Sequence, residues 1–281
     1  MNNFITRTLS AIVYAGLVSA SILFQPECFG RHMLIFGILF MIVSTLAVKE
    51  FHDLLGSDFK IQSYAMITNA LLFSTLYFFF FGDIIWKGLL LAYIAILLLA
   101  LILHLFRPQI NPIQSWGNFC AGQIMIALPF ALMNGIVFKN EFLMFALFIL
   151  VWVNDSGAYI VGSLMGKRKG GNHKMFPRVS PAKSWEGLIG GFIFDLAAGY
   201  VFYQIGWTES MGLTNSLLFA MAVGVFGTLG DLMESLFKRT LGVKDSGKFM
   251  PGHGGVLDRF DSLLLAAPVV YFFFVYLPSV Y

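Results

Sequence analysis

Long apolar runs alternate with short polar segments along the whole chain. A helix needs about 20 residues to cross a hydrocarbon core of about 30 Å. Nine runs come close to this length, at residues 8–24, 33–48, 61–81, 88–106, 117–138, 142–165, 185–206, 213–237 and 257–277. The first two runs are short and depend on their flanks. The pattern predicts an all-α fold, a polytopic integral membrane protein with about nine transmembrane helices.

Composition supports this prediction. Hydrophobic residues make up 58% and charged residues only 12% of the 281 residues, which is not the balance of a soluble globular domain. The polar connections between the runs are too short to hold a separate soluble domain. We therefore expect residues 1–281 to form a single transmembrane domain.

Most of the basic residues fall on one side of the predicted membrane. With a cytoplasmic N-terminus, 15 of the 18 Lys and Arg residues lie in inner segments, and only Arg31, Lys87 and Lys139 lie outside. Because such a bias sets the orientation of membrane proteins, we expect the N-terminus in the cytoplasm. The formal net charge of +3 gives no indication of nucleic-acid binding.

Charged residues are concentrated near the C-terminus of the chain. Asp231, Glu234 and Ser235 stand at i, i+3 and i+4 at the end of an apolar run, so a helix would place them on one face, about 5–6 Å apart. Asp258 and Asp261 repeat the i, i+3 spacing at the start of the next run. The bases that stand among these acids are Lys238, Arg239, Lys244, Lys248 and Arg259.

The residue types in this cluster point to phosphate chemistry. Carboxylates from two elements suit a hard divalent cation such as Mg²⁺, which takes oxygen ligands and keeps positions open for phosphate oxygens. The linking loop contains His253-Gly254-Gly255, where glycines allow backbone N–H groups to face an anion. The simpler interpretation is that the acids and bases pair with one another at the cytoplasmic rim. The whole constellation favours a site.

From Ser235 to Asp261 the chain has the sequence SLFKRTLGVKDSGKFMPGHGGVLDRFD. This run resembles the signature of the CDP-diacylglycerol synthases, also called phosphatidate cytidylyltransferases. In that signature Ser, Lys-Arg, Lys-Asp, His-Gly-Gly and Asp-Arg-x-Asp follow one another at fixed spacing. Met250 stands where members more often carry Leu, Ile or Phe, and the change keeps an apolar side chain.

Two earlier segments resemble the same family more weakly. The run that begins Asn154-Asp155 places polar groups inside an otherwise apolar span. SPAKSWEG, which begins at Ser180, resembles the family's SPKKTWEG element, with Ala182 in place of a Lys. Since one positive charge is lost there, Lys183 is the expected phosphate contact.

Acids inside the predicted spans are candidates for function, because a carboxylate at the bilayer centre costs roughly 2.5–3.5 kcal/mol. Asp155 lies in the sixth predicted span and Asp195 in the seventh. We expect both to line a polar cavity. For Asp195, a proton or metal role and a simple interhelical hydrogen bond both stay open. Small residues in the seventh span predict close packing against a neighbouring helix, namely Gly187, Gly190 and Gly191.

The resemblance implies transfer of the cytidylyl group of CTP to phosphatidic acid, with release of pyrophosphate. It implies catalytic roles for Lys238 and for three metal-binding aspartates, Asp231, Asp258 and Asp261. It implies substrate contacts from Ser180, Lys183, Ser235, Arg239, Lys244, Asp245, His253, Gly254, Gly255 and Arg259. The implied cofactor is Mg²⁺; acidic oxygen ligands also admit Mn²⁺, and a monovalent cation as a second ion.

The resemblance also divides the chain. Residues 1–140 would form packing and lipid-facing helices, and residues 141–281 the catalytic helices and cytoplasmic loops. The expected partners are CTP, phosphatidic acid and the lipids of the cytoplasmic membrane. Two alternatives stay open, namely a CTP-dependent transferase acting on another lipid or polyprenyl phosphate, and a secondary transporter, which would also carry acids within the membrane. The sequence leaves a homo-oligomer open.

Overall fold

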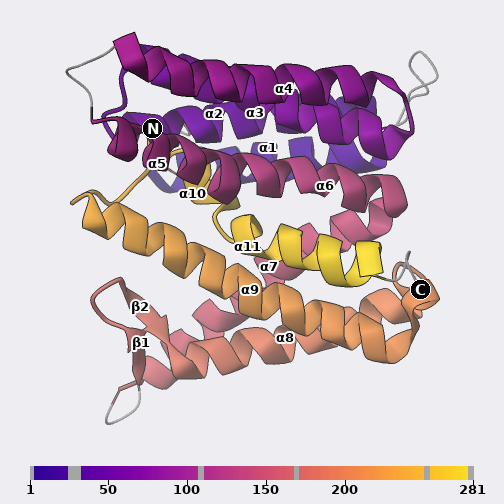
Figure 1. Ribbon diagram of the computed structural model, residues 1–281. Coiled ribbons are helices and arrows are strands. Elements are labelled where there is room, and N and C mark those ends of the chain that lie inside the picture. The colour runs from indigo at the N-terminus through magenta and orange to yellow at the C-terminus, as the bar shows by residue number, and fades with distance from the viewer. Residues whose placement is uncertain (1–2, 25–32, 107–110, 168–170, 250–253, 278–281) are drawn as a thin grey trace. The chain divides into compact units, whose positions relative to one another are not determined.

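The computed structural model describes residues 3–24, 33–106, 111–167, 171–249 and 254–277 (Figure 1). The fold is helical, as predicted. The chain forms two compact units, each assembled from two separate stretches of sequence. One unit takes residues Met1–Lys139 and Asp245–Phe260, and the other takes Asn140–Lys244 and Asp261–Tyr281.

The first unit is a bundle of mostly apolar helices. Helix α3 packs against α2, α4 and α6, and the short helix α10 contacts α2. Phe260, the last residue of α10, is buried between Phe40 and Phe130, with ring centroids 5.8 and 5.5 Å away. The elements of this unit are α1 (Asn3–Leu23), α2 (Leu34–Leu54), α3 (Phe59–Phe81), α4 (Ile85–Leu103), η2 (His104–Phe106), α5 (Pro112–Gly122), η3 (Gln123–Ala127), α6 (Leu128–Lys139) and α10 (Leu257–Phe260).

Local sequence explains where several of these helices begin and change. The side chain of Asn111 accepts hydrogen bonds from the amides of Ile113 and Gln114 and so caps α5, as expected of an N-cap residue. The predicted span at residues 117–138 is interrupted by the π-helical segment η3. Pro129 follows directly and has no N–H to donate, which explains why α-helical bonding is interrupted there.

The second unit is built on three long helices. Helix α7 packs along α8, α8 packs against α9, and α11 packs against α9 (Figure 1). A two-stranded antiparallel hairpin before α8 contacts both α8 and α9, and it pairs Lys174 with Ser184. The elements are α7 (Glu141–Gly166), β1 (Lys174–Phe176), β2 (Ser180–Ser184), α8 (Trp185–Gln204), η4 (Glu209–Met211), α9 (Gly212–Thr240), α11 (Leu263–Val270) and η5 (Tyr271–Tyr276).

The glycines of α8 allow its close contact with α7, as the sequence predicted. A Cβ atom on Gly187 would lie 2.9 Å from the carbonyl oxygen of Ala158, and one on Gly191 would lie 2.8 Å from Nδ2 of Asn154. A Cβ on Gly190 would collide with the side chain of Val161. Any side chain at these positions would force the two helices apart.

The number of spans differs from the prediction. Within the described residues, seven helices are long and apolar enough to cross a membrane, which makes this a multi-pass membrane protein. The first and last predicted runs are covered by shorter apolar helices, Thr8–Leu23 and Leu263–Tyr276, so a count of nine is not confirmed. The hairpin was not predicted. A boundary near residue 140 was predicted, and the segment Asp245–Phe260, which follows that boundary, belongs to the same unit as the N-terminal helices.

Candidate active site

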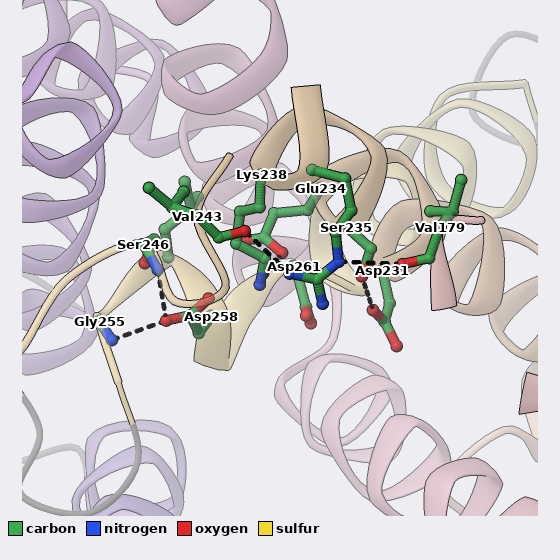
Figure 2. Close-up of polar contacts among 12 residues, drawn as sticks. Val179, Asp231, Glu234, Ser235, Lys238, Val243, Ser246, Gly255, Asp258 and Asp261 are labelled. Atoms are coloured by element: carbon green, nitrogen blue, oxygen red, sulfur yellow. Dashed lines mark hydrogen bonds and ion pairs between the residues drawn. The ribbon is translucent and has the colours of Figure 1, made fainter. Parts of the chain in front are cut away.

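One face of α9 carries four of the polar side chains that the sequence singled out. Asp231, Glu234, Ser235 and Lys238 stand at i, i+3, i+4 and i+7, the spacing that brings side chains together on a helix. Ser235 Oγ donates to Asp231 Oδ1 over 3.1 Å (Figure 2). The predicted acidic face therefore exists, and the hydroxyl of Ser235 is directed at a carboxylate.

Lys238 forms an ion pair with Glu234 one turn earlier on the same helix (Figure 2). Both side chains are buried, with 9% and 2% of their surface exposed. A buried charge needs a partner to offset its desolvation. Lys238, expected to touch substrate, thus neutralises Glu234 in this structure. The sequence placed Glu234 in the acidic cluster without a role of its own, although its i, i+4 spacing from Lys238 indicates an ion pair on one helix.

The hairpin brings a second lysine to α9. Lys183 in β2 pairs with Asp231, with 2.6 Å between Nζ and Oδ2, and each side chain stays about one quarter exposed, at 23% and 26%. Arg239 connects two backbone segments in the same region. Its Nε donates to the carbonyl oxygen of Val179 at 3.3 Å, and its Nη1 donates to the carbonyl oxygen of Val243 at 2.8 Å (Figure 2). Asp231 is therefore accessible, whereas the guanidinium of Arg239 is engaged with backbone.

A pocket of about 400 Å³ opens beside this pair, within the second unit. Its walls come from α7, the hairpin, α8 and α9, and Lys183 belongs both to the pocket and to the ion pair with Asp231. The lining is mostly apolar, with a small number of polar groups, as in many ligand sites. Those groups include Asn154, Asp155, Tyr159, Ser163, Lys174 and Thr228.

The two acids predicted inside the membrane have different surroundings. Asp155 lines the pocket and is exposed in the isolated chain. Asp195 is fully buried and lies outside the lining, and its Oδ2 accepts a hydrogen bond from Asn154 Nδ2 at 2.5 Å. Asn154 in turn accepts from Thr228 Oγ1 at 3.5 Å. Of the two readings left open for Asp195, the structure contains the interhelical hydrogen bond, which orients a side chain of the pocket wall.

Asp261 precedes α11 in the sequence, and its backbone approaches α9 closely. A Cβ atom on Gly230 would lie 2.6 Å from the carbonyl oxygen of Asp261, so only glycine permits this approach. Burial, and after it the neighbouring carboxylates of Asp231 and Glu234, raise the pKa of the Asp261 carboxyl well above its usual value. Three acids of the cluster therefore act on one another electrostatically.

Asp258, the third predicted metal ligand, belongs to the other unit and has a different environment. Its Oδ2 accepts hydrogen bonds from the amides of Ser246 and Gly255, at 2.9 and 2.7 Å (Figure 2). Gly254 takes a φ of +82°, a conformation that favours glycine. The Gly255 N–H, predicted to face an anion, donates to a carboxylate of its own loop.

The remaining predicted contacts lie on or near the surface. The residues Lys244, Asp245 and Arg259 are exposed, and Ser180 begins β2. His253 falls outside the described residues. Within the described ranges, no three His, Cys, Asp or Glu side chains are arranged to hold a metal ion. The metal set stays a prediction.

Sequence reasoning also missed Glu50, which lies in α2, among helices expected only to pack. Its carboxylate accepts hydrogen bonds from Val256 and Leu257, directly after the His-Gly-Gly element. The available signal was an acid, Glu50, in the last turns of an apolar helix that also carries Asp53, and it resembled an ordinary rim charge.

The chain is similar to individual proteins over about half of its length and to one protein family over nearly all of it. A phosphatidate cytidylyltransferase of Haemophilus influenzae is 46% identical over 140 residues, which cover 49% of this chain and 47% of that protein. The phosphatidate cytidylyltransferase of Bacillus subtilis is 44% identical over 124 residues, 44% of each chain. One from Staphylococcus saprophyticus is 46% identical over 130 residues, 46% of this chain and 47% of the relative.

The matched segments thus span about half the length of these curated relatives. The family comparison extends further. The sequence pattern of the cytidylyltransferase family matches residues 5–277, from α1 to the end of the described C-terminal helices. The chain belongs to the cytidylyltransferase family.

Proposed function

We propose that this protein transfers the cytidylyl group of CTP to phosphatidic acid, forming CDP-diacylglycerol and pyrophosphate for phospholipid synthesis. Family membership supports a cytidylyl transfer. The similar proteins are named phosphatidate cytidylyltransferases, which supports phosphatidic acid as the acceptor. The multi-pass fold suits a lipid acceptor, which can stay in the membrane while a soluble nucleotide arrives from water.

The observation that carries the proposal is the position of Lys183. Its ammonium group lies 2.6 Å from the Asp231 carboxylate and also lines the pocket of about 400 Å³. A polyanion that enters the pocket can therefore meet a cation next to the acidic cluster. The mostly apolar lining suits the glycerol and acyl portion of a lipid, and Lys174 adds a second positive charge at the hairpin.

In the reaction, an oxygen of the lipid phosphate attacks the α-phosphorus of CTP. A new P–O bond forms, and the bond to the β-phosphate oxygen breaks, so that pyrophosphate leaves with its electron pair. A phosphate monoester is largely dianionic near pH 7, since its second pKa is about 6, so no strong base is needed. Positioning and charge stabilisation then supply most of the catalysis. Lys183 would shift from Asp231 toward the incoming phosphate.

We propose that the acidic cluster binds a divalent cation. Asp231 and Asp261 belong to the same unit, and burial, followed by the neighbouring carboxylates, raises the pKa of Asp261; a bound cation would relieve the repulsion between the carboxylates. We propose that these two carboxylates hold Mg²⁺ or Mn²⁺. The cation would neutralise phosphate charge and polarise the phosphorus. A monovalent cation would bind as a second ion.

We also propose the location and orientation of the enzyme. The bias of Lys and Arg supports a cytoplasmic N-terminus, with the hairpin and the loop after α9 on the cytoplasmic side of a bacterial inner membrane. CTP would then reach the cluster directly. Labelling of a Cys introduced at Lys174, in a variant whose Cys28 and Cys120 are replaced by Ser, tests this orientation in intact and in opened cells: labelling that needs opened cells supports it, and labelling in intact cells contradicts it.

The test of the function is pyrophosphate release by purified protein in detergent micelles that contain phosphatidic acid, CTP and Mg²⁺. We expect release that requires all three. In the Asp261→Asn variant the release should fall by about 10²-fold or more, since a preorganised charge at the reacting phosphate is worth about that much. Glu209→Gln, which removes an exposed carboxylate of the same unit in η4, is the matched control and should keep wild-type activity.

Folded protein that releases no pyrophosphate with phosphatidic acid would contradict the proposed acceptor. Competition between phosphatidic acid and a polyprenyl phosphate would then identify the acceptor class. Release that does not depend on CTP would contradict the nucleotide assignment.

A further inference from the structure

Glu50 is a buried acid in a helix that otherwise serves packing. Only 9% of the residue is exposed. It lies near the C-terminal end of α2, where the helix dipole opposes a negative charge. An acid in such a place needs strong hydrogen-bond donors to offset its burial.

The donors come from the loop that precedes α10 and from Leu257, the first residue of α10. Ser246 Oγ donates to Glu50 Oε2 at 3.1 Å. The amide of Val256 donates to Oε1 and that of Leu257 to Oε2, each at 2.9 Å. All three donors are buried, and all belong to the same compact unit as α2. Three charge-assisted hydrogen bonds thus fix the loop to the helix.

Two glycines close the loop around the carboxylate. A Cβ atom on Gly247 would lie 2.6 Å from Glu50 Oε1. One on Gly255 would collide with both Glu50 and Ser246, and would lie 2.7 Å from the amide nitrogen of Gly247. The fit leaves no room for a side chain at either position, so the loop takes its shape from the carboxylate that it encloses.

The same loop also satisfies Asp258. Ser246 serves both acids, because its hydroxyl donates to Glu50 and its amide donates to Asp258. Gly255 gives its amide to Asp258, and the next two amides go to Glu50. Asp258 is therefore held in place by a loop that is itself held by Glu50.

We propose that Glu50 is a positioning residue of the cytidylyl transfer: through Ser246, Val256 and Leu257 it fixes the loop that carries Gly254, Gly255 and Asp258 in the shape needed to bind the triphosphate of CTP. This inference rests on the proposed function. Glu50 acts through the loop and not by direct contact with a substrate.

The test compares Glu50→Gln with Asp53→Asn, a matched loss of one carboxylate, one turn away on the same helix. Asp53 pairs with Lys49 and accepts a hydrogen bond from Gln62 in α3. Gln is isosteric with Glu but turns an NH₂ group toward N–H donors. In Glu50→Gln we expect hydrogen exchange of amides in the segment 254–260 to accelerate about 10- to 100-fold, the range for a lost hydrogen bond to a charged group.

Kinetics separate positioning from loss of folded protein. A smaller amount of folded enzyme lowers only the maximal rate, whereas a displaced loop should raise KM for CTP. We expect KM for CTP to rise about tenfold in Glu50→Gln and KM for phosphatidic acid to stay unchanged. Asp53→Asn should match the wild type in both constants and in exchange.

Ser246→Ala serves as a second variant, because it removes one donor and leaves the buried acid in place. It should give a smaller change in the same direction, and it decides the question if Glu50→Gln does not fold. Unchanged exchange, or faster exchange with an unchanged KM for CTP, would overturn the proposal. Hydrogen exchange needs no substrate, so a wild type that releases no pyrophosphate would instead overturn the proposed function, and the exchange data would still show whether Glu50 fixes the loop.

Discussion

The two units treat their acidic residues in opposite ways. In the first unit, Glu50 and Asp258 are satisfied by backbone amides and a hydroxyl. In the second, Asp231 and Glu234 are satisfied by lysine side chains. Backbone donors cannot leave without unfolding the loop, whereas a lysine can turn toward another anion. The comparison teaches that the acids of the two units have different tasks: those of the first unit shape the backbone, and those of the second hold side-chain charge.

The largest effect is expected where the lysine itself is buried. Lys238→Met leaves Glu234 buried without its cation, which costs about 3–5 kcal/mol of unfolding free energy when one partner of a buried pair is removed. Thermal unfolding in detergent should show this loss. The double variant Glu234→Leu/Lys238→Met should recover most of the stability, because no buried charge remains. A single variant as stable as the wild type would show that this pair is solvated.

The accessible lysine should affect activity more than stability. Lys183→Ala removes the cation that Asp231 and the pocket share, and we expect pyrophosphate release to fall by about 10²-fold. Lys174→Ala, a loss of the same charge from the first strand of the hairpin, should lower it only a few-fold. Equal losses in the two variants would mean that the hairpin supplies general positive charge rather than one specific contact.

A third prediction concerns the acids predicted inside the membrane. Asp195→Asn keeps a side-chain oxygen that can accept from Asn154, so we expect the unfolding free energy to change by no more than about 1 kcal/mol. Asp155→Asn changes a group of the pocket wall and should raise KM for phosphatidic acid several-fold. If both variants keep wild-type kinetics and metal dependence, the pocket does not take part in the reaction.

The smallest effect should come from Ser235→Ala. The hydroxyl makes one hydrogen bond to Asp231, at 3.1 Å, and its loss should cost about 1 kcal/mol. We expect the Mg²⁺ concentration for half-maximal activity to shift about fivefold, since Asp231 would be less well oriented. An unchanged metal dependence would separate Ser235 from the cation site and leave it a packing role.

Sequence determined the helices well because each signal was local. The apolar runs of α3, α7 and α9 predicted spans in the right places, and the glycines of α8 predicted its close packing on α7. The weak points had local causes too. The span at residues 117–138 changes from α-helical to π-helical hydrogen bonding before Pro129. The segment from Lys174 to Ser184 forms a hairpin through backbone pairing, which its charged side chains do not predict.

The site was predictable only in part. The spacing of Asp231, Glu234, Ser235 and Lys238 put them on one face, but it could not decide which cation each acid would take. Lys183 and Asp231 are far apart in sequence, and only the packing of the hairpin on α9 makes them neighbours. Family resemblance named the residues, whereas the structure distinguishes those that hold backbone from those that hold side-chain charge.

The hydrogen bond between Glu50 and Ser246 joins residues 196 positions apart. During synthesis, α2 leaves the ribosome long before the loop that supplies these three donors. The growing chain therefore carries the acid of α2 without them until the segment around Ser246 has been made. The bond can form only once this later segment returns to α2, so it is made after the contacts within the N-terminal helices.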